Sequence, residues 1–137
     1  MKEGFGCSQA LFASYGEQFG MDRETALKIS GAFAGGFGRT GDTCGAVTSA
    51  LMVIGLKYGW TKADDKETRA KTDSKVKEFL DKFRARRGSI LCRELLETDI
   101  GTSKGMDEAK LKKLFTTLCP NYVRDAVEIL EEILPEE

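Results

Sequence analysis

The sequence predicts an all-α protein: a single, compact helical domain over residues 1–137, with about six helices around a buried central helix at about residues 44–58. Apolar residues recur at helical spacing along most of the chain. No segment shows the period-two alternation that half-buried strands require. The 137 residues are 41% hydrophobic and include only two prolines, a composition that favours one ordered hydrophobic core.

The first half of the chain contains three predicted helices and one glycine-rich loop. Residues 8–20 place apolar side chains at helical spacing, and a second helix begins at Asp22. The loop at residues 35–43 ends in Asp42 and Thr43, which are capping residues for the central helix. Apolar side chains surround most of that helix, so we expect it to be buried on nearly all sides.

A long helix is predicted over residues 64–87, and its two halves differ. The second half repeats apolar residues at i, i+3, i+4 and i+7, namely Val76, Phe79, Leu80 and Phe83, so we expect it to pack on the core. The first half is charged and has almost no apolar stripe, which favours a solvated face over a binding surface.

Three shorter helices complete the expected fold. Ser89 caps a short helix that runs to Leu96, and another helix covers residues 107–118. Pro120 occupies a first-turn position of the last helix, whose apolar face continues to Leu134.

Charge and composition exclude several classes of function. The 21 basic and 22 acidic residues nearly cancel, so there is no global electrostatic case for nucleic acid or a membrane surface. The longest apolar stretch, residues 46–56, is too short to span a bilayer, and the polar first residues precede no signal-peptide segment. We therefore expect a cytoplasmic protein without direct membrane insertion.

The chain has no histidine, which narrows the chemistry further. Cys–His nucleophile pairs, Ser–His–Asp triads and Cys₂His₂ zinc fingers all need an imidazole. The remaining candidates for chemistry are the four cysteines, and each lies at or near a sequence signal for the start of a helix. They are Cys7, Cys44, Cys92 and Cys119. A helix N-terminus stabilises a thiolate, so we expect lowered thiol pKa values at these positions.

The cysteine spacing contains no Cys-x-x-Cys pair, so neither a thioredoxin motif nor a zinc ribbon can be read from it. Cys44 is the best candidate for the attacking thiolate, because it follows the glycine-rich loop and heads the central helix. The loop has two interpretations: a nest of N–H groups that holds an anion or positions the Cys44 thiolate, or a sharp turn between helices. Gly36-x-Gly38-x-x-Gly41 follows no strand and is therefore a weak nucleotide signal.

Two arginines are close in sequence to cysteines. Arg39 precedes Cys44 and Arg93 follows Cys92, so either guanidinium would lower a thiol pKa if it lay beside the sulfur. For Arg86 and Arg87 we expect a role in surface solubility.

The chain resembles the redox-active proteins named after their cysteine pattern, C_GCAxxG_C_C. The matching segments cover residues 6–10, 35–39, 44–51 and 83–96, together with Cys119 and the helix that follows it. One departure is Ser49, where the family motif has glycine. The resemblance implies a helical fold, a site made of all four cysteines, and a functional link to a transporter.

Three hypotheses follow for the function. The first is thiol-based redox chemistry, in which the four cysteines cluster in the fold and exchange electrons between dithiol and disulfide with a redox partner. The second is a Cys₄ site for an iron–sulfur cluster or zinc, with the same four cysteines as ligands. The third is a non-enzymatic helical partner protein of a transport system. The sequence leaves open the cysteine pairing, the need for any cofactor, and whether the chain forms a homodimer.

Overall fold

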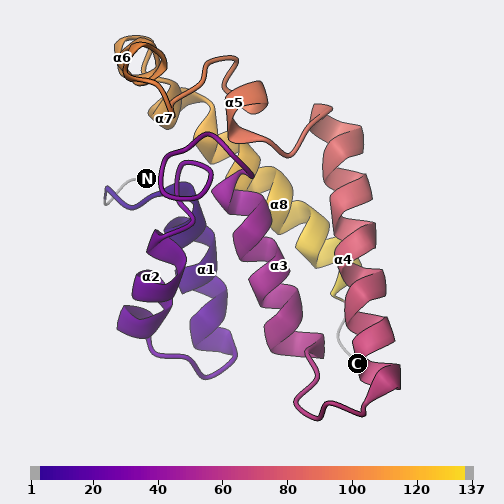
Figure 1. The fold of residues 1–137 in the computed structure, drawn as a ribbon. Coiled ribbons are helices and arrows are strands. Elements are labelled where there is room, and N and C mark those ends of the chain that lie inside the picture. The colour runs from indigo at the N-terminus through magenta and orange to yellow at the C-terminus, as the bar shows by residue number, and fades with distance from the viewer. Residues whose placement is uncertain (1–3, 135–137) are drawn as a thin grey trace.

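The computed structural model describes residues 4–134, and helices account for most of this part of the chain (Figure 1). The six longer helices have 9–22 residues, and two further helices have four residues each. The longer ones are α1 (Cys7–Gln18), α2 (Arg23–Gly31), α3 (Gly45–Tyr58), α4 (Lys66–Arg87), α6 (Ser103–Leu111) and α8 (Cys119–Ile133). The short ones are α5 (Cys92–Leu95) and α7 (Leu114–Thr117). Within residues 4–134 the only β pairing is one isolated bridge, so the all-α prediction is confirmed.

Helix α3 is the centre of the fold. It packs against α1, α4 and α8, and Ala46, Val47, Ala50, Val53 and Ile54 are fully buried in its contacts. The ribbon shows the same arrangement, with α1 and α2 on one side of α3 and α4 on the other (Figure 1). The predicted buried central helix is therefore confirmed.

Three buried serines join the first three helices. The Ser8 hydroxyl of α1 donates a hydrogen bond to the Ser30 carbonyl of α2, and the Ser49 hydroxyl of α3 donates to the Ser8 carbonyl, both at 2.7 Å. All three side chains are fully buried, so each hydroxyl needs a partner inside the protein. The Ser49 hydroxyl has a buried acceptor on α1, so serine is accommodated at the position where the family motif has glycine.

The start of the second helix was predicted correctly, whereas the cap of the third was not. Asp22 accepts a hydrogen bond from the Thr25 N–H and is the N-cap of α2. The N-cap of α3 is Cys44, and the Asp42 carboxylate instead accepts from the N–H and hydroxyl of Thr43. Asp42 turns its side chain to its own neighbour because the loop backbone here pairs with another segment, described below.

Helix α4 is the longest helix, and it shows the predicted difference between its halves. Phe79 and Phe83 are fully buried, with ring centroids 6.0 Å apart. The first half is mostly exposed, but the Thr72 hydroxyl is buried and donates to the Tyr58 carbonyl at the end of α3. No helix of residues 4–134 has both the length and the apolar composition needed to cross a membrane.

The segment before the last helix differs from the prediction of one helix over residues 107–118. Helix α6 begins earlier, because the Thr102 hydroxyl accepts a hydrogen bond from the Gly105 N–H and caps it. The helix is then interrupted at Lys113, whose φ of 55° is left-handed, before the single turn of α7. Ser89 accepts from the Leu91 N–H, although the N-cap of α5 is Leu91 itself.

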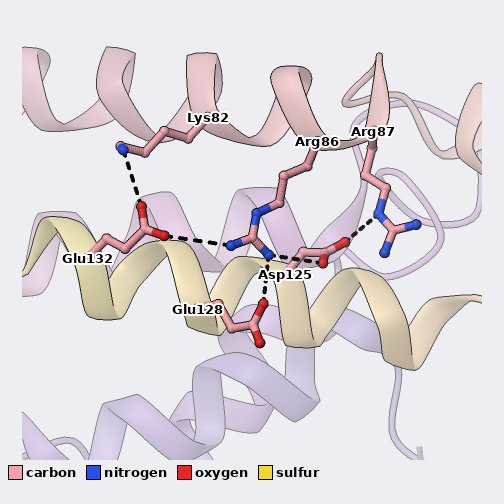
Figure 2. Close-up of polar contacts among 6 residues, drawn as sticks. All are labelled: Lys82, Arg86, Arg87, Asp125, Glu128 and Glu132. Atoms are coloured by element: carbon pink, nitrogen blue, oxygen red, sulfur yellow. Dashed lines mark hydrogen bonds and ion pairs between the residues drawn. The ribbon is translucent and has the colours of Figure 1, made fainter.

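Helices α4 and α8 are joined by a network of charged side chains (Figure 2). Asp125 of α8 is buried and accepts hydrogen bonds from both Arg86 and Arg87 of α4. Arg86 also pairs with Glu128 at 2.7 Å and with Glu132 at 3.6 Å. The expectation that Arg86 and Arg87 serve only surface solubility is therefore wrong: they fix α4 against α8.

Several helices begin at the same end of the molecule. Helices α1, α3 and α8 start there, α4 finishes there, and α5 lies beside them (Figure 1). Each of the four cysteines is at or next to the first residue of one of these helices. The helix directions therefore bring cysteines that are far apart in the sequence to one end of the bundle.

Candidate functional site

The four cysteines line one cavity. Cys7, Cys44, Cys92 and Cys119 all contribute to the wall of a space of about 270 Å³ at the end of the bundle described above. Every one is a free thiol and is buried, with 5–8% of its surface exposed. The structure thus brings together all four residues that the sequence singled out.

Cys7 is the most strongly hydrogen-bonded of the four sulfurs. The Cys44 thiol donates a hydrogen bond to it, and the backbone N–H groups of Gly35, Gly45 and Ser8 donate as well. These donors favour the thiolate, and they outweigh the opposing effect of burial. The pKa of Cys7 is lowered from 9.0 to about 6, mainly by the hydrogen bond from Cys44. At neutral pH Cys7 is the thiolate of this site.

Gly45 lets the central helix approach Cys7. A Cβ at this position would lie 2.6 Å from Cys7 Sγ and 3.0 Å from the Ser8 backbone nitrogen, closer than non-bonded atoms approach. The absence of a side chain therefore allows the N–H of Gly45 to reach the sulfur. Sequence reasoning included Gly45 in the family motif but gave it no role, because only the packing of α1 on α3 reveals the contact.

The glycine-rich loop contributes directly to the site. Five consecutive residues, 35–39, have φ between 61° and 71°, which is a left-handed conformation. Gly35 lies in this run and donates its N–H to the Cys7 sulfur. The loop is therefore a sharp turn between helices and also a source of N–H donors, so it combines features of both interpretations of its sequence. Its donor serves Cys7, whereas the sequence pointed to Cys44.

A short antiparallel pairing places Cys44 beside Cys92. Thr43 and Leu91 form the isolated bridge, the Cys44 N–H donates to the Ile90 carbonyl at 2.7 Å, and the Cys92 N–H donates to the Asp42 carbonyl at 2.6 Å. These bonds hold the first turns of α3 and α5 next to each other. The sequence gave no signal for this pairing, because each segment is only about three residues long.

The other three cysteines have raised pKa values. The hydrogen bond that Cys44 donates to Cys7, together with burial, raises the pKa of Cys44 well above its ordinary value. Burial, assisted by the negative charge of Cys7, raises the pKa of Cys92 and of Cys119 to about 12 in each case. The prediction that every helix-leading cysteine has a lowered pKa is wrong for these three, because desolvation exceeds the effect of the helix N-terminus.

Most of the remaining cavity wall is apolar. Its larger side chains are Phe5, Leu95, Leu96, Phe115 and Tyr122. The Tyr122 hydroxyl donates to the Leu95 carbonyl at 2.6 Å, which ties α8 to α5. The guanidinium of Arg87 lies over the Tyr122 ring, 5.2 Å from its centroid, so the charge network of Figure 2 also supports the cavity wall.

The two arginines near cysteines in the sequence have different positions. Arg39 lines the cavity, and its Cγ would be 2.8 Å from a Cβ built on Gly35. Arg93 lies outside the cavity wall, with its Nη1 3.5 Å from the Gly41 carbonyl. The direct effects that lower the Cys7 pKa come from hydrogen bonds and not from either guanidinium.

A metal site is the alternative use of the four cysteines. Four thiolates around one zinc ion would each need a sulfur about 2.3 Å from the metal. Within residues 4–134, no three Cys, Asp or Glu side chains are arranged so that they could hold one metal ion. The described residues therefore show no ready metal cluster, and the Cys₄ hypothesis stays a prediction.

Comparison with known proteins gives one match. No curated protein and no solved structure matches the chain. One family model matches residues 5–133, nearly the whole chain, and its description is "Putative redox-active protein (C_GCAxxG_C_C)". With its four cysteines gathered at one cavity, the chain belongs to the C_GCAxxG_C_C family.

Proposed function

We propose that the protein carries out thiol–disulfide exchange, with Cys7 as the attacking thiolate and Cys44 as the thiol that resolves the mixed disulfide. One observation carries the proposal: Cys7 and Cys44 line the same cavity, and Gly45, the neighbour of Cys44, approaches the Cys7 sulfur so closely that a Cβ there would lie 2.6 Å from it. Cys44 therefore lies beside Cys7, and its hydrogen bond is the main cause of the lowered Cys7 pKa. A thiolate next to a thiol is the arrangement from which a disulfide forms.

The pKa values support this division of roles. A lowered pKa makes Cys7 a thiolate at neutral pH, which is the nucleophilic form. Cys44 keeps its proton while Cys7 is negatively charged. Once Cys7 forms a covalent bond, that charge is gone, the main cause of the raised Cys44 pKa disappears, and Cys44 can ionise.

The reaction balances as two exchanges. The Cys7 thiolate attacks one sulfur of a disulfide RSSR, so the Cys7–SR bond forms and the S–S bond of the substrate breaks. The departing RS⁻ takes the proton of Cys44 and leaves as RSH, which leaves Cys44 as a thiolate. The Cys44 thiolate then attacks the Cys7 sulfur and releases the second RS⁻, which takes a proton from solvent. Two protein thiols are oxidised by two electrons, and one disulfide is reduced to two thiols. The reverse reaction regenerates the dithiol from a pool of reduced thiols, so the proposal assigns the cycle to the cytoplasm.

Cys92 and Cys119 have a different part in the proposal. Both remain protonated at neutral pH, and both line the cavity beside the reacting pair. They are therefore weak nucleophiles, and the first exchange does not involve them. The functional link to a transporter, which the family resemblance implies, stays a prediction.

Peptide mapping after mild oxidation tests the pairing. Trypsin cleaves after Lys and Arg and leaves each cysteine in a different peptide: residues 3–23, 40–57, 88–93 and 114–124. Each possible disulfide therefore gives a cross-linked peptide of distinct mass. After treatment with diamide we expect the peptides 3–23 and 40–57 to be linked and two thiols per chain to be lost.

Matched serine variants complete the test. Cys7→Ser and Cys44→Ser should each abolish the two-thiol loss, whereas Cys92→Ser and Cys119→Ser should keep it. Circular dichroism of each variant checks that the helical fold is intact. Four thiols unchanged by diamide, or a linkage confined to the peptides 88–93 and 114–124, would sink the proposal. Stoichiometric zinc or iron in the purified protein would favour the metal hypothesis instead.

A further inference from the structure

We infer that the substrate of this exchange is a small-molecule disulfide with apolar arms and an anionic group, which enters the cavity of the four cysteines and places its anion at Arg39. The inference rests on the proposed thiol–disulfide function and adds its substrate class. Three features support this substrate class: the burial of the sulfurs, the size and lining of the cavity, and the position of Arg39.

Burial of the nucleophile excludes large substrates. Only 8% of Cys7 and 5% of Cys44 is exposed. A thiolate attacks a disulfide along the axis of the S–S bond, so both substrate sulfurs and the departing group need room in line with the Cys7 sulfur. A disulfide fixed on the surface of another folded protein cannot meet this requirement at a buried sulfur. The reacting disulfide must enter the cavity.

The cavity has the size and lining for a small organic molecule. Its volume of about 270 Å³ lies near the lower end of the range of small-molecule pockets, which is about 300–1,000 Å³. Apolar and aromatic side chains make up most of the wall, so apolar arms of a ligand would be desolvated favourably there. The cavity therefore suits a compact disulfide with apolar arms.

Arg39 supplies the charge preference. Among the described residues that line the cavity, it alone carries a permanent charge, and no ion pair engages it within residues 4–134. The side chain is exposed, so the cation lies where the cavity meets solvent. The Arg39 side chain packs beside Gly35, the residue whose N–H donates to Cys7. An anionic group held by Arg39 therefore lies at the mouth of the cavity that Cys7 also lines.

The exchange itself keeps the balance given above, with the small disulfide as the oxidant. The substrate leaves as two thiols, and the protein keeps a Cys7–Cys44 disulfide. Arg39 is a binding residue in this scheme: it attracts the carboxylate of the substrate and takes no part in electron transfer. Its guanidinium also offsets the repulsion between an anionic substrate and the Cys7 thiolate.

Three aliphatic disulfides of similar size provide the test. Dithiodipropionate is anionic, 2-hydroxyethyl disulfide is neutral, and cystamine is cationic. The rate of Cys7–Cys44 oxidation by each is divided by its rate with free 2-mercaptoethanol, which removes intrinsic reactivity. We expect the anionic probe to exceed the cationic one by about fivefold to tenfold at low salt, the effect of one partly screened charge pair. Insulin, as a protein disulfide, should react far more slowly than all three.

Variants of Arg39 separate binding from folding. Arg39 has a φ of 66°, so asparagine, which tolerates this conformation, is the suitable neutral replacement. Arg39→Asn should remove the preference for the anionic probe, so that the ratio of the anionic to the cationic normalised rate falls to about one. Arg39→Lys should retain the preference. Arg84→Gln, on an exposed position of α4 away from the cavity, should behave as the unmodified protein.

The outcomes distinguish the inference from the function on which it rests. If all three probes react at equal normalised rates, or if Arg39→Asn keeps the preference, the substrate inference is wrong and the exchange function stands. If insulin is reduced as fast as the small probes, the cavity does not select for size and the inference is also wrong. If none of the probes forms the Cys7–Cys44 disulfide, the proposed function itself fails.

Discussion

The Cys44 thiol donates a hydrogen bond to the sulfur of Cys7, and this contact makes two similar buried cysteines chemically different. The acceptor also receives three backbone N–H groups, whereas the donor receives only that of Ala46. The negative charge of the pair therefore resides on Cys7 and the shared proton on Cys44. The asymmetry arises from the positions of Gly35 and Gly45, which bring their N–H groups to one sulfur.

The thiolate of Cys7 should be visible in a pH titration. Absorbance at 240 nm reports thiolates, and we expect one thiolate per chain to form with a midpoint near pH 6, since the pKa of Cys7 is about 6. The thiolates of the other three cysteines should form only above pH 9. Cys44→Ala removes the largest cause of the low pKa, so the first midpoint should move toward 9.

A control variant separates this effect from general disruption of the cavity. Cys119→Ala removes a neighbouring thiol that does not hydrogen-bond to Cys7, and its first midpoint should stay near 6. Equal midpoints in Cys44→Ala and Cys119→Ala would contradict the role assigned to the Cys44 hydrogen bond.

The stability of the fold should depend on pH through Cys7. Its pKa is lower in the folded chain than in the unfolded chain, so the stabilisation is complete above about pH 9 and is lost as the pH falls through 6. Urea unfolding of the protein and of Cys7→Ser should show a difference in free energy that grows between pH 6 and 8. The slope should approach about 1.4 kcal/mol per pH unit, the value for one proton. A difference that is constant with pH would contradict the assignment.

Two glycines of α3 should respond in opposite directions to alanine. Gly45→Ala places a Cβ 2.6 Å from Cys7 Sγ, so it should displace the sulfur, raise the pKa of Cys7 and lower the melting temperature. Gly55→Ala meets no atom within 4 Å on an exposed part of the same helix, and it should stabilise the protein by about 1 kcal/mol. Thermal unfolding and the 240 nm titration measure both effects. A benign Gly45→Ala would mean that α1 and α3 do not pack this closely.

Ser49 should contribute through its hydrogen bond to α1. Ser49→Ala loses the 2.7 Å bond to the Ser8 carbonyl and should cost about 1 kcal/mol. Ser49→Gly, which restores the residue of the family motif, should cost about 1 kcal/mol more than alanine because glycine disfavours a helix interior. Chemical denaturation compares the three proteins. If glycine were at least as stable as serine, the hydroxyl would have no stabilising role.

The α4–α8 charge network should depend on its buried member. Asp125→Asn removes the charge that Arg86 and Arg87 share, and we expect a loss of about 1–3 kcal/mol in the free energy of unfolding. Lys82→Gln removes only an exposed pair with Glu132 at 3.2 Å and should cost about 0.5 kcal/mol or less. Urea denaturation at low and high salt measures the free energy of unfolding of each variant. Equal losses for both variants would contradict the prediction that the buried carboxylate contributes more than the exposed pair.

Helical periodicity was sufficient to predict the architecture. The apolar residues of α3 surround the helix, and Phe79 and Phe83 repeat at helical spacing in α4, so both elements and their burial follow from local pattern. The break at Lys113 did not follow from it, because the residues on either side favour helix and only the path of the chain requires a left-handed residue there.

The sequence by itself determined that this is a helical protein and singled out Cys7, Cys44, Cys92 and Cys119 as the candidate site, because periodicity, the lack of histidine and the cysteine positions can be read without the fold. Only the tertiary structure decided which sulfur carries the charge. The Cys7 pKa depends on N–H groups from Gly35 and Gly45 and on the thiol of Cys44, all at least 28 positions away in the chain. Desolvation and hydrogen bonding act over a few ångströms, and sequence distance does not report them.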